Sequence, residues 1–373
     1  MKIKAAIGAA VIGVLWAWPA VTYGAAPLTS AEARAVDRRV FEGNCAACHG
    51  FDGKGRPQSQ VGFETPLPDF TDCSYASREA DADWFGVIHE GGTLRVFSQM
   101  MPAFGQALTA EEISSAPRHI RSFCTDKRWT PGEFNLPRAL FTEKAFPEDE
   151  AVVTVNADAE GAGAVETTFI WEKRLGPNSQ IEVSVPIAAA KNGTPQRWRA
   201  GLGDIALAVK HNVYFNVDRG SIVSLGAEAR LPTGSTRRGL GSGATVFEPF
   251  VAYGQILPDD AFLQMHALGE IPLSGGGVSE VGLRTAIGKT WTTGDYGRTW
   301  TPIVELLLTR ELEAGAYTEV DVAPSLQVSL STRRHILASL GARIPVNKPA
   351  LRNTLLGFYF IWDWYDGGLF EAW

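Results

Sequence analysis

From about residue 150 onward, apolar and polar residues alternate along the chain with a period of two. In SIVSLGAEARL (221–231), every second residue from Val223 to Leu231 is apolar, and the residues between them are small, polar or charged. EVDVAPSLQVSL (319–330) repeats the pattern. Such alternation places an apolar row and a polar row on opposite faces of a strand. The rear two thirds of the chain are therefore predicted to be all-β.

About twelve strands are expected in this region, at 150–160, 163–175, 180–191, 198–215, 220–233, 245–258, 261–274, 279–293, 299–314, 317–333, 335–347 and 353–364. Most exceed the ~5 to 6 residues usual in soluble sheets. They suit the ~9 to 11 residues with which a tilted strand crosses a bilayer. Length therefore predicts an antiparallel transmembrane β-barrel over residues 150–373, with a soluble β-domain as the alternative.

The connections and the end of the chain agree with a barrel. Tight turns such as NVDRGS and STRRH alternate with longer ones such as LPTGSTRRGLGSGATV. Bacterial outer-membrane barrels have short periplasmic turns, longer outer loops and aromatic girdles. Aromatic residues gather in the last seventeen positions, up to Trp373. Because Glu371 breaks the alternation there, the last strand is expected to stop near Trp364 and to leave a tail.

The first third of the chain has helical patterns instead. Thr29 precedes Glu32 by three residues, and Thr109 precedes Glu112 by three. Both pairs are capping boxes that open amphipathic helices. Pro117 lies inside the second helix and is expected to bend it or to shorten it.

The stretch CAACH holds Cys45, Cys48 and His49 at the end of the first helix. Two thiols at this spacing can each bond a haem vinyl group, while the next imidazole lies under the iron. The alternatives are a redox dithiol and half of a zinc site. Zinc needs a second ligand pair, and none follows at a suitable spacing. One covalently bound haem c is therefore predicted.

The loop SQMMPAFG resembles the distal-ligand loop of class I bacterial cytochromes c. This resemblance implies that Met101 is the second iron ligand opposite His49, with Met100 as the alternative. His89 and His119 are the fallback ligands. Ligation by histidine and methionine saturates the iron. The expected chemistry is then one-electron transfer, with no residue assigned a catalytic role.

The composition excludes some classes of protein, and the N-terminal residues indicate export. The 373 residues are 45% hydrophobic and carry a formal charge of -7, so a disordered chain and a nucleic-acid partner are not expected. Lys2 and Lys4 precede an apolar run and small residues, which is the pattern of a secretory signal peptide. Export permits disulfides. Cys73 and Cys124 bracket the distal loop and are expected to be bridged, the alternative being two separate thiols.

The domain organisation predicted is a signal peptide at 1–25, a class I cytochrome c domain at 26–125, a linker at 126–149 and the barrel at 150–373. GLGDIALAVKHNVYF and the following EARLPTGSTRRG resemble the outer-membrane barrel family named after the MetA pathway of phenol degradation. The fused arrangement is similar to that of iron-oxidising cytochrome-porins, although the haem domain is here a full class I cytochrome. A twelve-strand barrel is too narrow for a ~100-residue domain, so the cytochrome is expected at the periplasmic mouth.

The function expected is one-electron transfer by a monohaem cytochrome anchored in the outer membrane. Periplasmic electron carriers or small redox-active molecules are the expected partners, together with outer-membrane lipid. The resemblance to cytochrome-porins implies a metal (iron) oxidase role as an enzymatic possibility. A solute channel for small or aromatic molecules, with an accessory haem domain, is the alternative function. A soluble periplasmic electron carrier is the third.

Overall fold

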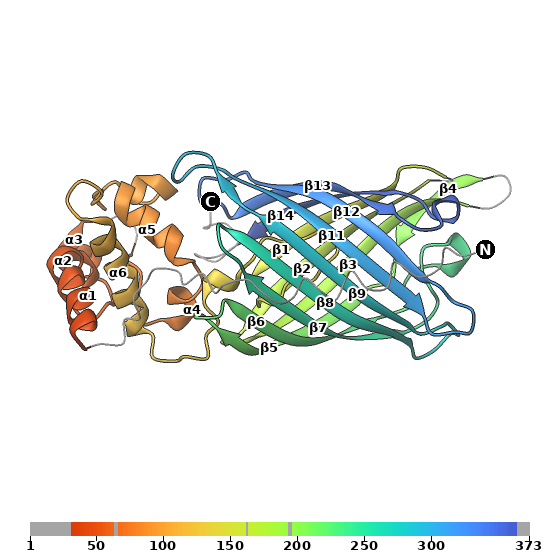
Figure 1. The fold of residues 1–373 in the computed structure, drawn as a ribbon, viewed down its shortest axis with the longest axis horizontal. Coiled ribbons are helices and arrows are strands. Elements are labelled where there is room, and N and C mark those ends of the chain that lie inside the picture. Colours follow the sequence, from red (N-terminus) through yellow and green to blue (C-terminus); the bar gives the residue numbers. More distant parts are fainter. Residues whose placement is uncertain (1–30, 63–65, 162, 193–195, 364–373) are drawn as a thin grey trace, which may run out of the picture.

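The computed structural model describes residues 31–62, 66–161, 163–192 and 196–363. The predicted signal peptide, Thr29 and the tail up to Trp373 lie outside the described residues. A helical domain and a β-barrel lie end to end along the longest axis of the molecule (Figure 1). The predicted order of an all-α domain followed by an all-β barrel is confirmed.

The helical domain packs two long helices around a small apolar core. Phe41 on the first helix and Ile120 on the last share this core with Ala46 and Phe70. The capping box of Thr109 and Glu112 is present. Its helix is not shortened at the proline but continues to Phe123. The helices are α1 (Ala31–Asn44), α2 (Ala46–His49), α3 (Gln58–Val61), α4 (Cys73–Ala76), α5 (Asp81–Glu90), η1 (Gly92–Arg95) and α6 (Ala110–Phe123).

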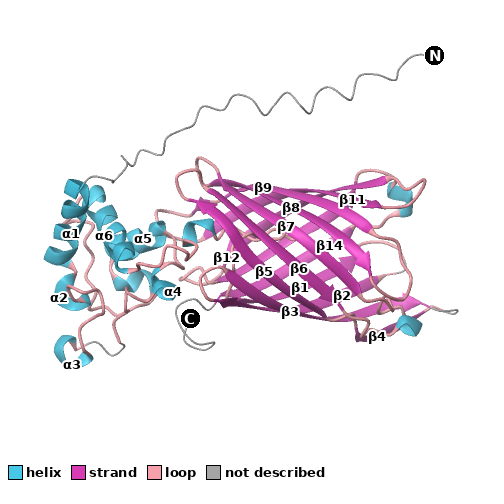
Figure 2. Cartoon of the chain, turned by 90° about the horizontal axis from the view of Figure 1, so that it is seen from below, coloured by secondary structure: helices cyan, strands magenta, loops and turns pink. Residues whose placement is uncertain are grey.

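The barrel is one sheet of antiparallel neighbours, seen from the side in Figure 2. Its segments are β1 (Glu150–Asp158), β2 (Ala164–Leu175), β3 (Ser179–Asn192), β4 (Arg197–Leu202), β5 (Ala206–Asn216), β6 (Ser221–Arg230), β7 (Val246–Ile256), β8 (Ala261–Pro272), β9 (Glu280–Lys289), β10 (Trp291–Thr292), β11 (Thr299–Glu311), β12 (Thr318–Ser329), β13 (Ile336–Pro345) and β14 (Leu355–Asp363). Short 3-10 turns are η2 (Gly132–Phe134), η3 (Thr236–Arg238) and η4 (Pro349–Leu351).

The sheet closes on itself, because β14 pairs with β1 and β9 pairs with β11. β4 and β5 both pair with β3, and β9 and β10 both pair with β11. The fourteen described segments therefore form twelve barrel strands, as predicted. The expected strand 198–215 is interrupted at Gly203, whose N–H donates to the carbonyl of Pro186 (2.8 Å), while the Asp204 carboxylate accepts from the N–H groups of Gly234 and Ser242.

The barrel wall is apolar outside and polar inside. On β5, Leu207 and Val209 point outward and are 46% and 56% exposed, whereas Lys210 and Asn212 point inward and are each 4% exposed. A soluble protein has the opposite arrangement, but a lipid-embedded barrel requires this one. The protein is therefore an outer-membrane barrel, and the soluble β-domain alternative is wrong. Among the described residues, no helix is both long and apolar enough to cross a bilayer.

Candidate haem site and barrel lumen

The haem-binding motif is built where α1 ends. The N–H of Cys45 donates to the carbonyl of Phe41 (2.8 Å), which continues α1 into the motif. The N–H of His49 donates to the carbonyl of Cys45 (2.9 Å), so that one turn, α2, carries the whole motif. Gly50 then reverses the chain with a φ of +75°, a conformation that favours glycine. The local fold thus presents Cys45, Cys48 and His49 from a single turn.

The side chains of this turn are in states that suit a haem. Cys45 and Cys48 are free thiols, both half-buried. Burial, and then the neighbouring Cys48, raise the pKa of Cys45 to about 11. Burial lowers the pKa of His49 to about 4, so its imidazole is neutral, as a metal ligand must be. Among the described residues, His49 Nδ1 is buried and has no hydrogen-bond partner. The turn therefore presents two free thiols and one neutral imidazole, which are the groups that two thioether bonds and an iron ligand require.

Met101 lies on the same side of the domain as the haem-binding motif. Met101 and Cys45 pack against one apolar cluster, which Ile88, Ile113 and Ala116 form. Met100, by contrast, is 54% exposed. This packing agrees with Met101 as the iron ligand, which remains a prediction.

The two alternative histidine ligands, His89 and His119, have other neighbours than Met101. His89 hydrogen-bonds through Nδ1 to Glu90 (2.7 Å) and lies 5.6 Å, between ring centroids, from Tyr296 of the barrel. His119 packs beside Phe41, with ring centroids 5.0 Å apart. His89 thus belongs to the contact between the two domains, and His119 to the helix packing.

The predicted disulfide between Cys73 and Cys124 is present. It ties the first residue of α4 to the residue that follows α6. The distal loop with Met101 lies between these two positions in the sequence. The disulfide therefore links the two ends of the chain segment that contains Met101, the candidate ligand opposite His49.

The helical domain is docked on the turns at one end of the barrel. Arg95, which is 5% exposed, donates to the carbonyls of Tyr296 (3.1 Å) and Thr332 (3.2 Å) and pairs with Asp83 (2.9 Å). His335 and Glu79 add a contact of 3.0 Å between Nε2 and Oε1. Thr332 and His335 belong to the tight turn that the sequence predicts on the periplasmic side. The cytochrome domain lies at this periplasmic mouth.

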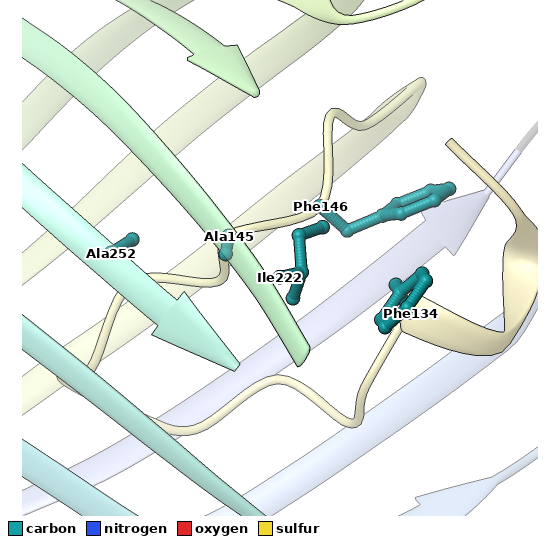
Figure 3. Packing of buried hydrophobic residues seen from close by; sticks show 5 residues of the cluster. All are labelled: Phe134, Ala145, Phe146, Ile222 and Ala252. Carbon is teal, nitrogen blue, oxygen red and sulfur yellow. The ribbon is translucent and has the colours of Figure 1, made fainter. Parts of the chain in front are cut away.

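The predicted linker does not run outside the barrel. None of the residues 131–149 is exposed. Phe134, Ala145 and Phe146 pack against Ile222 and Ala252 on the inner wall (Figure 3). We call residues 132–149 the plug, because they fill part of the lumen.

The plug is hydrogen-bonded to opposite parts of the wall. Glu305 on β11 accepts the backbone N–H groups of Leu140 (2.8 Å), Phe141 (3.1 Å) and Thr142 (2.8 Å). Gln264 on β8 donates to the carbonyl of Pro137 (2.8 Å). Further contacts come from β2, β3, β5, β6, β9 and β14, through Glu172, Gln180, Lys210, Ser224, Arg284 and Tyr359. The plug is therefore held around most of the circumference.

Three buried carboxylates lie close to one another where the plug joins β1. Oxygen atoms of Glu148, Glu150 and Asp363 lie within 4.8 Å of one another. Lys144 Nζ is 2.6 Å from Glu148 Oε1 and 3.5 Å from Glu150 Oε2. An ammonium group thus already occupies the position in which a metal cation would neutralise these acids.

Residues 33–120 match the family model described as "Cytochrome C oxidase, cbb3-type, subunit III". This part of the chain is a c-type cytochrome domain. Domains of this type carry haem c, which supports the cofactor predicted from the motif. The number of haems and their bonds to Cys45 and Cys48 remain predictions.

Solved outer-membrane structures resemble the barrel only distantly. The KdgM porin is 10% identical and covers 58% of this chain and 99% of its own, with a TM-score of 0.37. The NanC porin is 12% identical over 57% of this chain and 99% of its own, with a TM-score of 0.39. An outer membrane channel from Pseudomonas putida F1 is 10% identical over 61% of this chain and 100% of its own, with a TM-score of 0.42. No curated protein sequence matches the chain.

Sequence reasoning missed the plug. The sequence predicts a linker at 126–149, because prolines and charges punctuate this segment. The same segment contains LPRALF and KAFPED, and its large apolar residues are unusual for an exposed linker. Those residues were the available indication that the segment is buried.

Proposed function

We propose that the protein is an outer-membrane electron-transfer protein, with one haem c at the periplasmic mouth of a plugged barrel. The observation that carries this proposal is the fixed position of the cytochrome domain, which Arg95 joins to two periplasmic turns through a side chain that is 5% exposed. A domain that only needed to diffuse to partners would not require such a contact.

Each residue of the haem site has a separate task in this proposal. Cys45 and Cys48 would anchor the porphyrin, and His49 and Met101 would bind the iron. A haem held by these residues would supply reversible one-electron transfer. The chain contributes an apolar surrounding for the haem, through Ile88, Ile113 and Ala116.

The barrel holds the redox centre at the membrane and opens a path from the outside to the plug. The plug stands between this path and the periplasm, so a small donor or acceptor entering from outside would meet the plug first. Periplasmic carriers exchange electrons with the exposed side of the cytochrome domain. The solute-channel alternative is weakened because the buried plug fills part of the lumen and is bonded to strands on many sides of it.

The test uses intact cells that carry the protein. A reductant unable to cross the outer membrane is added, and the haem absorbance is followed over time. The proposal expects reduction of the haem in these cells and none in cells with the Cys45→Ala/Cys48→Ala variant, which keeps the barrel but cannot retain haem. If the haem stays oxidised although a permeant reductant reduces it, electron entry through this protein is wrong. Loss of solute uptake on deletion would then favour the channel.

A further inference from the structure

The cytochrome domain has an exposed group of large apolar side chains on the segment that follows η1. Val96, Phe97 and Met100 are 63%, 39% and 54% exposed. A single exposed apolar residue is ordinary, but several that lie together mark an interaction surface. We call residues 96–100 the apolar loop.

The backbone holds the first residue of this loop in an unfavourable conformation. Val96 has a φ of +59°, in the left-handed region that favours glycine. For a β-branched residue this conformation is strained. The N–H of Val96 donates to the carbonyl of Thr93 (3.2 Å), and the N–H of Phe97 donates to the carbonyl of Gly92 (2.8 Å). A tight turn thus presents an exposed valine where glycine would fit better, and strain of this kind gathers at functional sites.

The apolar loop lies at the rim of the barrel wall. Arg333 Nε donates to the carbonyl of Arg95 (2.9 Å), and the Arg333 guanidinium lies 4.6 Å from the centre of the Phe97 ring. Arg333 belongs to the turn between β12 and β13, which are neighbouring strands of the wall. Arg95 also donates to the carbonyl of Tyr296 in the turn between β10 and β11. The loop is therefore beside two periplasmic turns of the wall.

Tryptophans on the outer face of the wall indicate where the lipid ends on the periplasmic side. Trp171, Trp291 and Trp300 are exposed. Trp171 pairs with Ala151 at the beginning of β1, and Trp291 pairs with Trp300 at the beginning of β11. All three lie toward the end of the barrel that carries the cytochrome domain. Outer-membrane barrels have aromatic girdles at both lipid boundaries, so these residues mark the periplasmic boundary.

The apolar loop is within reach of the lipid headgroups at this boundary. Leu330 is the last exposed residue of the outward apolar row on β12, and its N–H donates to the carbonyl of Ile336 (2.7 Å), which closes the turn. Arg333 follows Leu330 by three residues, which span at most about 11 Å of extended chain. The headgroup layer on each side of a bilayer is roughly 5 to 8 Å thick. Phe97, which packs on Arg333, therefore lies at or close to this layer.

We propose that the apolar loop inserts into the periplasmic headgroup layer of the outer membrane that surrounds the barrel. Its surface continues the apolar outer wall, and a lipid-bound apolar surface is typically buried about 5 to 10 Å into the headgroup boundary. Arg298 is exposed in the turn that Arg95 contacts, and Arg333 lies under Phe97. Both guanidinium groups attract anionic phospholipid headgroups. The proposal goes beyond electron transfer, because the loop binds lipid whether or not the haem exchanges electrons.

Insertion gives the cytochrome domain a second attachment besides the barrel turns. The apolar loop is bonded to the backbone of the residue that follows it, since the N–H of Met101 donates to the carbonyl of Ser98 (3.3 Å). The carbonyl of Met101 in turn accepts from the N–H of Gly92 (3.1 Å). Lipid contact therefore restrains the segment from Gly92 to Met101 as a unit.

Spin labels on the full-length haem-loaded protein test the proposal in nanodiscs of phosphatidylethanolamine and phosphatidylglycerol. Val96→Cys and Met100→Cys each introduce one cysteine for the label. Of the four native cysteines, the disulfide takes two and haem attachment would take the other two; wild type treated with the label is the blank. Saturation of the label's electron paramagnetic resonance measures collisions with O₂, which concentrates in lipid, and with a water-soluble nickel chelate. Each reading is compared with the same sample under nitrogen.

The matched control is Val36→Cys. Val36 is also an exposed valine of the helical domain, but it lies on α1, at the end of the domain away from the barrel (Figure 1 and Figure 2). The ratio of O₂ to nickel collisions should be at least about twofold higher at positions 96 and 100 than at position 36, because only the first two lie in the headgroup boundary. Heat-modifiable mobility and the haem spectrum establish that each variant is folded.

Two results would overturn the proposal. Equal ratios at positions 36, 96 and 100 would mean that the apolar loop faces water. Few collisions with either reagent at positions 96 and 100 would mean that protein covers the loop, either a second copy of the chain or another partner. None of these results bears on haem reduction in cells, so the loop and the proposed electron transfer are tested separately.

Discussion

Met101 and Met100 are neighbours in sequence but differ in their surroundings. Met101 packs on the cluster that also contacts Cys45, and Met100 is more than half exposed. Replacing Met101 by Ala should remove the sixth iron ligand and lower the reduction potential. Axial ligands tune haem potentials over about 0.8 V, so a fall on the order of 0.1 V or more is expected. Potentiometric titration of the haem absorbance measures it.

Met100→Ala provides the comparison. It removes the same kind of side chain one residue away, and its potential should stay close to that of the wild type. If Met100→Ala lowers the potential and Met101→Ala does not, the ligand is Met100. The sequence alone left both methionines open, because spacing within one loop does not determine which side chain turns toward the core.

At the scale of elements, Glu305 holds the plug to the barrel wall. Glu305 is buried, and its carboxylate accepts hydrogen bonds from three consecutive backbone N–H groups of the plug. Glu305→Ala would leave these donors unsatisfied, at about 1 to 3 kcal/mol for each buried group. The plug should then loosen, and ion conductance through the barrel in planar bilayers should rise above that of the wild type.

Glu311→Ala is the control for this prediction. Glu311 lies on the same strand, but at its exposed outer end. It should leave the conductance unchanged while removing one negative charge, as Glu305→Ala does. Equal conductance of Glu305→Ala and wild type would mean that Glu305 is not needed to close the lumen.

Strands could be predicted from sequence and the plug could not, for one physical reason. The strand at 261–274 can be predicted from the alternation of apolar and polar residues, because successive side chains of a strand point to opposite faces of the sheet. Its observed bounds, Ala261–Pro272, differ by two residues. The burial of Phe146, in contrast, depends on Ile222, a residue 76 positions later that forms the facing wall. Local pattern carries no information about such a partner.

At the scale of the whole molecule, Glu79 links the cytochrome domain to the barrel. Burial raises the pKa of Glu79, but attraction by His335, Arg121 and Arg95 outweighs burial, so the pKa lies below its usual value. A carboxyl whose pKa is lowered by folding stabilises the fold above its unfolded pKa of about 4.3. That stabilisation is lost as the pH falls through the lower folded pKa.

Glu79→Gln should therefore lower the thermal midpoint of the haem domain at pH 7, by roughly 4–8 °C for each kcal/mol lost. The gap between the midpoints of the variant and the wild type should shrink below the unfolded pKa of about 4.3. It should close only below the lowered folded pKa, where Glu79 is protonated in both the folded and the unfolded wild type. Haem absorbance during heating at several pH values measures this. Glu32→Gln, on the exposed face of α1, should follow the wild-type curve throughout. A gap between Glu79→Gln and wild type that stays constant down to pH 3 would show that the charge of Glu79 does not hold the two domains together.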